Sequence, residues 1–400
     1  LTTSGAMNLN AVIGNGKNLT LNGSGGITLA GRLQGLATVD VTGATTLTGG
    51  DGGGSLSTIS SSGTQTFHSA LTLGGSALLE GVGITLGTVT GGGYNLKVRD
   101  TGVTTFGGAV SGVADLATDA GGTSVIGGTI ASTGAQIYSD SLQLNANSVL
   151  TGSSLTLGTV TGGGFDLTLV GSGTGTSTLG SGVSNVGSLA VTAGSGGIVL
   201  GGGTVATTAT QIYNSPVRLS ADTVLTGTTI TTAGSATVDG TGDGIQSLGV
   251  TGNAVFGAAV GKTAGKALEF LSVSGTTALS GDVTTSTAGG GTGSQTYTGN
   301  VSLNAASTLT GSTVLFGADN TVDKVDGNGR NLVLNFSGPT VLAGGFGQRA
   351  GNKIASLTLG NGGSTTLLGN VETTGPQSYS DSLVLGAAAT LNSGSGSVSL

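Results

Sequence analysis

Apolar and small polar residues alternate along the chain in many short segments. These segments are about three to six residues long and are bounded by Gly, Asn, Asp and Ser. A period of two is the pattern of a strand that buries one face, and the bounding residues tolerate the positive φ angles that corners need. No segment has the 3.6-residue period or the capping pattern of a helix. The pattern therefore predicts an all-β protein of short strands and tight corners.

A longer repeat organises these segments. Five of them begin with Gln, carry an aromatic residue two positions later and continue into two apolar residues spaced by one position. The steps from Gln to Gln are 71, 75, 84 and 82 residues, and the long repeats run approximately over 1–86, 87–157, 158–232, 233–316 and 317–400. A chain that repeats in this way is a stacked array. The five pairs are Gln65 and Phe67, Gln136 and Tyr138, Gln211 and Tyr213, Gln295 and Tyr297, and Gln377 and Tyr379.

Each long repeat contains about four sub-repeats of about 20 residues, the length of one coil of a β-solenoid. Short strands could also pair as antiparallel hairpins in a sandwich. The 20-residue recurrence instead favours stacking of each strand on its counterpart in the next coil, which is a parallel β-helix of roughly 20 coils about 4.8 Å apart. We expect residues 1–400 to form a single solenoid segment. Because its two ends fall at nearly the same phase of the repeat, we expect it to be part of a longer array.

Composition excludes several other classes of protein. Mean hydropathy is +0.31 and only 7% of residues are charged, unlike a disordered chain. The 83 glycines have no three-residue period, which excludes collagen. A net charge of −7 argues against nucleic-acid binding. The chain has no cysteine for disulfides, and no run of about 18 apolar residues that would insert into a membrane.

The repeat phrases resemble those of a known family. GTVTGGG, T-L-T-G and GNGxNL, found over essentially the whole chain, are similar to the repeats of filamentous-haemagglutinin-like exoproteins and autotransporter passengers of Gram-negative bacteria. The resemblance implies a right-handed parallel β-helix that is secreted through the outer membrane. It also implies a place at the cell surface and a role in adhesion or biofilm cohesion, through extracellular polysaccharide or the surface of a host or neighbouring cell.

The Gln-x-aromatic positions have two interpretations. Alternation places Tyr138 on the same face as Leu142 and Leu144, which predicts that the tyrosines are buried and that each Gln satisfies backbone groups at a corner. In the alternative, the tyrosines form a row about 19 Å apart on the surface, and each stacks on a sugar ring.

Acidic residues are the other place to look for chemistry. Asp239 and Asp243 in DGTGDG, and Asp319, Asp323 and Asp326 in DNTVDKVDGNG, are weak candidates for binding Ca²⁺. Their spacing matches neither an EF-hand nor the calcium-binding nonapeptide repeat, so polar turns are the preferred interpretation. His68 is the only histidine, and other copies carry Ser, Asn or Thr at its position, which gives no support to a Ser-His-Asp triad. We expect no catalysis and no cofactor.

Two longer connections carry basic residues. The distance between the second and third apolar segments of a repeat is 10 residues in the first three repeats and 15 in the last two. The added stretches hold Lys262, Lys266, Arg349 and Lys353. Insertions in a solenoid often form a binding side, and these could contact an anionic glycan or a neighbouring rod; the alternative is a solubilising loop. Because their starts lie 86 residues apart, or about four coils, we expect both loops at the same edge.

The sequence therefore predicts a non-catalytic structural and adhesive rod from a large secreted surface protein. The alternatives are a self-assembling extracellular fibre or sheath subunit that stacks coil on coil or side by side, a polysaccharide-degrading β-helix enzyme, and an ice-binding solenoid. The last needs a regular T-x-T face, and the copies vary too much to provide one.

Overall fold

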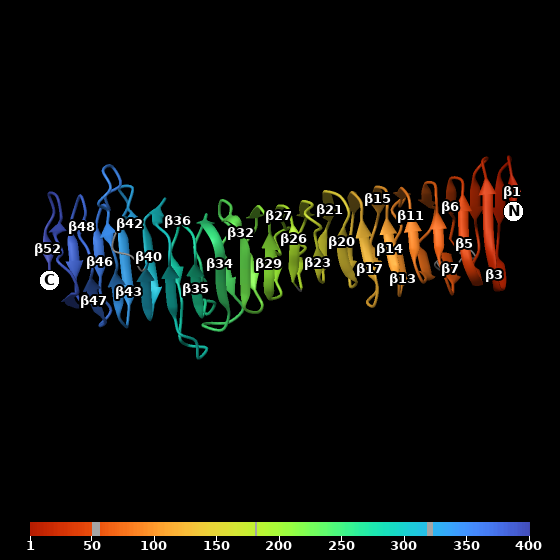
Figure 1. Cartoon of the computed structure of the whole chain (residues 1–400). Coiled ribbons are helices and arrows are strands. Elements are labelled where there is room, and N and C mark those ends of the chain that lie inside the picture. The colour runs from red at the N-terminus through yellow and green to blue at the C-terminus, as the bar shows by residue number, and fades with distance from the viewer. Residues whose placement is uncertain (50–56, 181, 318–322) are drawn as a thin grey trace. The chain divides into compact units, whose positions relative to one another are not determined.

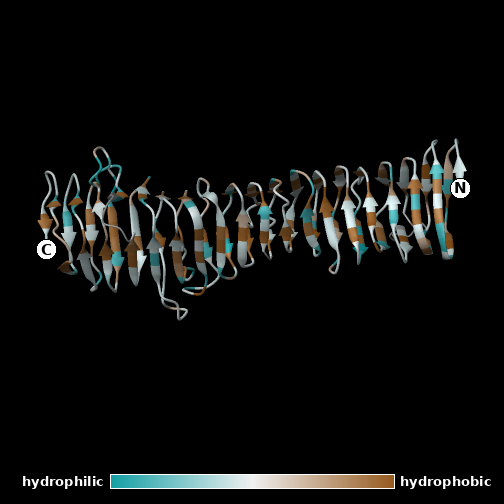
Figure 2. Ribbon diagram, in the orientation of Figure 1, coloured by the Kyte–Doolittle hydropathy of each residue, from teal (hydrophilic) through white to brown (hydrophobic). Residues whose placement is uncertain are grey.

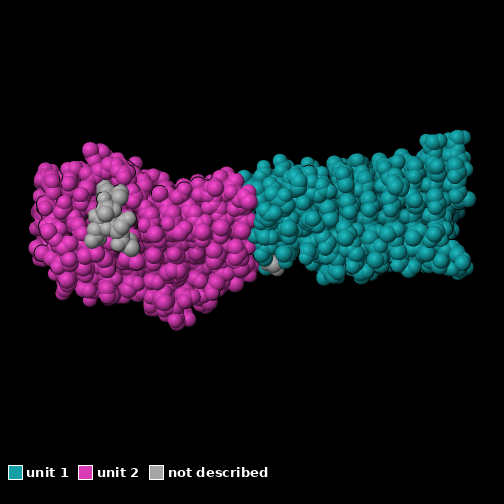
Figure 3. Space-filling view, viewed as in Figure 1, with its two compact units in different colours: residues 1–197 teal, residues 198–400 magenta. Residues whose placement is uncertain are grey.

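The structure is a computed structural model that describes residues 1–49, 57–180, 182–317 and 323–400. Every helix or strand in these residues is a β-strand, and all of the strand pairings are parallel. The right-handed parallel β-helix predicted from the sequence is confirmed. The chain divides into two compact units, Leu1–Gly197 and Ile198–Leu400, which are described separately (Figure 3).

Unit 1 has three strands in each coil, and each strand stacks on its counterparts to form one of three sheets (Figure 1). Two longer strands, β3 (Val12–Gly23) and β5 (Leu33–Thr42), bend around a corner and belong to two sheets each. The β10 sheet comprises the first parts of β3 and β5, then β7 (Ser57–Ser61), β10 (Ala77–Gly81), β13 (Leu96–Asp100), β16 (Leu116–Thr118), β19 (Ala135–Tyr138), β22 (Ser154–Leu157) and β25 (Ser177–Leu179). The β11 sheet comprises β1 (Thr2–Thr3), the second parts of β3 and β5, then β8 (Gln65–Phe67), β11 (Ile84–Leu86), β14 (Val103–Phe106), β17 (Thr123–Ile126), β20 (Ser141–Leu144), β23 (Val160–Thr161) and β26 (Val183–Val186). The β12 sheet comprises β2 (Met7–Leu9), β4 (Ile27–Leu29), β6 (Thr45–Leu47), β9 (Leu71–Leu73), β12 (Val89–Thr90), β15 (Val110–Val113), β18 (Thr129–Ser132), β21 (Ser148–Gly152), β24 (Leu167–Gly171) and β27 (Leu189–Thr192).

Unit 2 has the same construction, and its bent strands are β32 (Thr223–Thr232) and β34 (Ser247–Phe256). The β43 sheet comprises β28 (Ile198–Leu200), β31 (Val217–Leu219), β33 (Val238–Gly240), the single residue Val260, β37 (Val283–Thr284), β40 (Ser307–Gly311), β43 (Leu332–Phe336), β46 (Leu357–Leu359), β49 (Gln377–Tyr379) and β52 (Val398–Ser399). The β44 sheet comprises β29 (Gly203–Thr207), the first parts of β32 and β34, then β35 (Phe270–Val273), β38 (Ser294–Tyr297), β41 (Thr313–Phe316), β44 (Thr340–Leu342), β47 (Ser364–Leu367) and β50 (Ser382–Leu385). The β42 sheet comprises β30 (Thr210–Tyr213), the second parts of β32 and β34, then β36 (Thr277–Leu279), β39 (Val301–Leu303), β42 (Asp323–Asp326), β45 (Gly345–Phe346), β48 (Val371–Glu372) and β51 (Leu391–Asn392).

The interior of each unit is filled by ladders of apolar side chains. In unit 1, Leu86, Phe106 and Ile126 lie in register on successive coils and are fully buried. Hydrophobic and polar residues alternate along the strands, as the period of two requires (Figure 2). In unit 2, Tyr297 stacks on Phe316 with ring centroids 5.5 Å apart. Close packing of such ladders is the main source of stability.

Glycine forms corners where a side chain would collide. A Cβ on Gly91 would lie 2.3 Å from the Cα of Val113 in the next coil, and Gly93 has a φ of 81°. Both conditions exclude other residues, because Cβ contacts under about 3 Å are not tolerated and L-residues rarely adopt positive φ. The GGG phrase of the sequence is therefore a corner.

The long sequence repeat does not correspond to a whole number of coils. Gln65 lies in β8 and Gln136 in β19, eleven strands later, and eleven strands make three and two-thirds turns. Each repeat therefore begins one face away from the previous one. In unit 2 the three Gln residues lie in three different sheets: Gln211 in the β42 sheet, Gln295 in the β44 sheet and Gln377 in the β43 sheet.

In the described part of the chain we find no helix with the length and apolar character that crossing a membrane requires.

Candidate functional site

The five Gln-x-aromatic pairs form a buried module that joins neighbouring coils. All five Gln side chains are at most 1% exposed, and the four tyrosines are at most 3% exposed. The burial predicted from alternation is confirmed for these residues. They cannot form a row on the surface for two reasons: they are inside, and consecutive copies lie on different faces.

Each Gln amide links the preceding strand of its own coil to the next coil. In Gln136, Nε2 donates to the carbonyl oxygens of Ile130 at 3.2 Å and Thr151 at 2.7 Å. Gln211 repeats this with Val205 and Thr226, both at 2.8 Å. In these two copies the acceptors lie six residues before and 15 residues after the Gln. The corresponding acceptors are the carbonyls of Ile59 and Glu80 for Gln65, Val283 and Thr310 for Gln295, and Val371 and Asn392 for Gln377.

The tyrosine completes the module. Its hydroxyl donates to Oε1 of the Gln two residues earlier, at 2.8–2.9 Å in all four copies. Burial raises the pKa of each tyrosine, so the hydroxyl stays protonated and remains a donor. In the first copy Phe67 has no hydroxyl, and Oε1 of Gln65 is a buried acceptor without a hydrogen-bond donor. The arrangement is structural, because every polar atom of a complete module is bonded inside the solenoid.

The four basic residues of the long connections do not form one patch. Lys262 and Lys266 lie between Val260 of the β43 sheet and β35 of the β44 sheet. Arg349 and Lys353 lie between β45 of the β42 sheet and β46 of the β43 sheet. The two loops therefore leave different corners of unit 2, and the expectation of one shared edge is wrong (Figure 1). The reason is the offset of one-third of a turn between consecutive repeats.

Most of this positive charge is paired with acids on adjacent coils. Lys262 Nζ lies 2.9 Å from Asp282, and Lys353 Nζ lies 3.0 Å from Glu372. Arg349 lies 2.9 Å from Oδ2 of Asp326, whose side chain is only 10% exposed. Among the described residues Lys266 has no ion pair. These contacts tie each loop to its neighbours, and they reduce the charge that is available to a ligand. Ligand binding by these residues stays a prediction.

The acids considered for Ca²⁺ are dispersed into separate contacts. Asp239 accepts from the Thr263 hydroxyl at 2.8 Å, and Asp326 is paired with Arg349. Asp243 lies in the turn after β33. Asp319 and the side chain of Asp323 lie outside the described residues. Within the described ranges, no group of three or more His, Asp or Glu side chains is arranged to hold a metal ion.

The only histidine lies at the surface. His68 Nε2 is 3.0 Å from Asp40 Oδ1 on the preceding coil, and both side chains are about half exposed. This is a surface contact between two coils.

A buried acidic group escaped the sequence analysis. Asp100, 1% exposed, accepts from the backbone of Gly83, Gly102 and Ile84 and from the Thr104 hydroxyl at 2.7–2.9 Å. Asp140 is 2% exposed and accepts from Gly122 N and Ser124 Oγ. Burial is the main cause of the raised pKa of Asp140, to which the charges of Asp119 and Asp100 add. Asp100 stands two residues before Gly102, which is a signal visible in the sequence. The glycine bonded to Asp140 lies 18 residues earlier, on the preceding coil, and gives no such signal.

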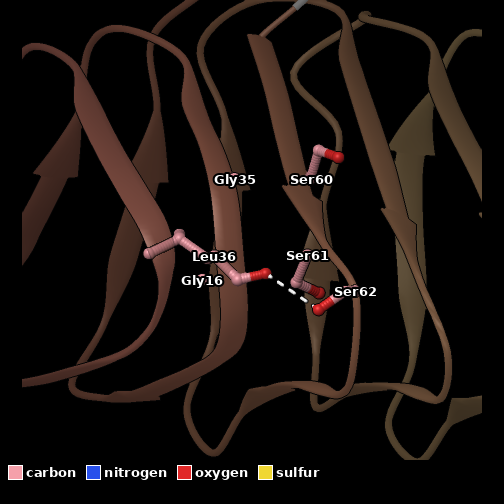
Figure 4. Close-up of a pocket in the computed structure, with 6 residues that line it drawn as sticks. All are labelled: Gly16, Gly35, Leu36, Ser60, Ser61 and Ser62. Atoms are coloured by element: carbon pink, nitrogen blue, oxygen red, sulfur yellow. Dashed lines mark hydrogen bonds between the residues drawn. The ribbon is translucent and has the colours of Figure 1, made fainter.

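The hollows of unit 1 include a notch of about 410 Å³ at the β10 sheet (Figure 4). It forms where the registers of β3 and β5 shift, at Gly16 and Gly35, both with positive φ. Leu36 and three hydroxyls line the rest, and the Ser62 hydroxyl points at the Leu36 carbonyl. The lining residues Ser60, Ser61 and Ser62 offer hydrogen bonds and no acid or base.

No family model matches the chain, and no curated protein or solved structure matches it. The resemblance to filamentous-haemagglutinin-like proteins therefore rests on the repeat phrases.

Proposed function

We propose that the chain is a structural and adhesive segment of a large secreted protein at the surface of a Gram-negative bacterium, and that it has no catalytic activity. The observation that supports this is the use of its polar residues. Buried Gln amides, Asp carboxylates and Ser or Thr hydroxyls bond one coil to the next. Three of the four basic loop residues do the same through ion pairs. Such cross-linking suits a segment that must keep its form outside the cell.

The test is adhesion by the purified chain. Beads coated with the full chain should attach to bacterial or epithelial cells, or bind members of a glycan array. Beads coated with the denatured chain should not. Failure to attach to any cell and to bind any glycan would contradict the proposal. Reducing ends released from polysaccharides would point to an enzyme, and concentration-dependent sedimentation to a self-assembling fibre.

A variant with Lys262, Lys266, Arg349 and Lys353 all replaced by Ser tests the loops directly. If they contact an anionic glycan, the variant should attach more weakly and salt should mimic the change, because exposed charges are screened beyond about 8 Å at physiological salt. Equal attachment by the variant and the parent would assign Lys262, Arg349 and Lys353 to their ion pairs alone and would leave Lys266 without a role in binding.

A further inference from the structure

An outward-facing phenyl ring lies on the β44 sheet of unit 2. Phe270 begins β35, where it pairs with Ser247 on one side and Ser294 on the other. Its neighbour Leu271 is fully buried, so alternation directs Phe270 outward. The ring is half-buried, whereas Phe256, Phe316, Phe336 and Phe346 of the same unit are at most 1% exposed. An aromatic ring placed outside such an aromatic-poor solenoid is not needed by the core.

A shallow cavity of about 300 Å³ lies over this ring. Its lining is Ser247, Glu269, Phe270, Thr292 and Ser294. One wall is formed by Thr292, in the long connection after β37, and by Ser294, the first residue of β38, whose hydroxyls lie 2.7 Å apart. The cavity thus combines one aromatic ring with three hydroxyls and one carboxylate.

A backbone hydrogen bond fixes the main chain of Glu269 at the edge of this cavity. The backbone N–H of Glu269 donates to the Gln246 carbonyl at 2.8 Å. A Cβ on Gly291 would lie 2.1 Å from Cγ of Glu269, so the absence of a side chain at Gly291 makes room for it. No ion pair of Glu269 occurs among the described residues, in contrast to Asp282 and Glu372 on nearby coils. The carboxylate is therefore available as a hydrogen-bond acceptor.

We propose that Phe270, Glu269 and the surrounding hydroxyls form a binding subsite for an uncharged hexopyranose unit of a polysaccharide. An aromatic face provides apolar contact area for the C–H face of a sugar ring, and a carboxylate and hydroxyls provide acceptors and donors for its hydroxyl groups. The cavity volume is at the small end for ligand sites, which suits one ring of a longer chain. The negative charge of Glu269 disfavours a uronate. This inference rests on the adhesive function proposed above, and its subsite does not include the basic side chains of the loops.

The experiment compares uncharged and anionic tetrasaccharides on the full chain. Cellotetraose, maltotetraose and mannotetraose serve as uncharged probes and tetramannuronate as the anionic one, with binding measured by saturation-transfer NMR and calorimetry. At least one uncharged probe should bind, and Phe270→Ala should weaken it about tenfold or more. Phe270→Leu keeps the apolar bulk and should weaken it similarly, which separates loss of the aromatic face from loss of folding. Glu269→Gln should strengthen tetramannuronate relative to the parent.

The matched control is Phe165→Ala. Phe165 in unit 1 is 36% exposed and lies over the glycine turn at Gly163, outside the proposed subsite. It should leave binding unchanged. If none of the uncharged probes binds, or both Phe270 variants bind as well as the parent, the subsite is overturned. If the beads still adhere in that case, the adhesive function stands without it; if they do not, both fall.

Discussion

The coil-joining module of Gln65 lacks the hydrogen bond from a tyrosine hydroxyl that the other four copies have. Its Oε1 is buried without a donor, because Phe67 stands where the other copies have tyrosine. We predict that Phe67→Tyr raises the free energy of unfolding by about 0.5–1.5 kcal/mol, the net value of a hydrogen bond. The measurement is urea unfolding followed by circular dichroism.

The reverse change provides the control. Tyr138→Phe removes the donor to Gln136 Oε1 and should lower the free energy of unfolding by about 1–3 kcal/mol, the cost of a buried polar group left unpaired. Effects of the same sign in the two variants would show that ring packing, and not the amide oxygen, decides stability at these positions.

The buried carboxyl of Asp140 should make the stability of the protein depend on pH. Its pKa is raised in the folded protein, mainly by burial. The folded state therefore binds the proton more tightly than the unfolded chain, whose Asp titrates near pH 3.9, and stability is lost as pH rises through the interval between the two values. The Asp140→Asn variant has no titrating carboxyl at this position and therefore lacks this pH dependence of stability. Relative to that variant, the parent should gain stability when denaturant unfolding is repeated from pH 7 down to about pH 3.5. A difference that stays constant with pH would contradict the assignment.

At the scale of elements, the ion pairs of the two long loops differ in how deeply the acidic partner is buried. The side chain of Asp326 is 10% exposed and that of Asp282 is 30% exposed. Arg349→Ala should cost about 1–3 kcal/mol, because it leaves a largely buried carboxylate without its cation. Lys262→Ala should cost about 0–1 kcal/mol, as for an exposed pair. Thermal unfolding of the two variants checks the order, and a larger loss for Lys262→Ala would reverse it.

The sequence predicted these elements better than it predicted their partners. Strands, corners and buried tyrosines follow from a period of two and from glycine chemistry, which are local properties. The partner of Lys262 depends on coil length: Asp282 lies 20 residues later, one coil on, and neither position is unusual by itself. Phe270 was missed because an outward ring and an inward ring differ only in parity relative to Leu271.

For the molecule as a whole, the fold class was predictable but the phase of its repeats was not. Dividing 71 residues by about 20 suggests about four coils, whereas the repeat makes three and two-thirds turns. The missing third of a turn depends on the number of strands in the repeat, eleven, which the residue count does not give. That fraction decides which side chains share a face. It separates Lys262 from Arg349, and it places Gln295 and Gln377 in different sheets.

The eleven-strand repeat makes a final prediction about deletions in unit 1. Removing residues 65–135 joins Thr64 to Gln136 and deletes eleven strands, β8–β18. Gln136 then takes the place of Gln65, with the Ile59 carbonyl six residues before it and the Ser61 hydroxyl beside it, as in the native first copy. Removing residues 77–135 deletes nine strands, β10–β18, which is three whole coils. Gln136 then follows Ser76, and the Leu71 carbonyl stands six residues before it, at the ladder position that Ile130 holds three coils later in the native chain.

We expect both deletions to remain folded with stabilities within about 1 kcal/mol of each other, because each leaves the buried amide an acceptor six residues before it. Circular dichroism of the full chain with each deletion, followed through urea unfolding, measures the difference. Greater stability in the three-coil deletion by about 1–3 kcal/mol or more would mean that whole coils stack interchangeably and that the one-third turn added by an eleven-strand repeat is not tolerated. The expected equality follows from the module alone, since both deletions resume the chain at Gln136 and keep a carbonyl six residues before it.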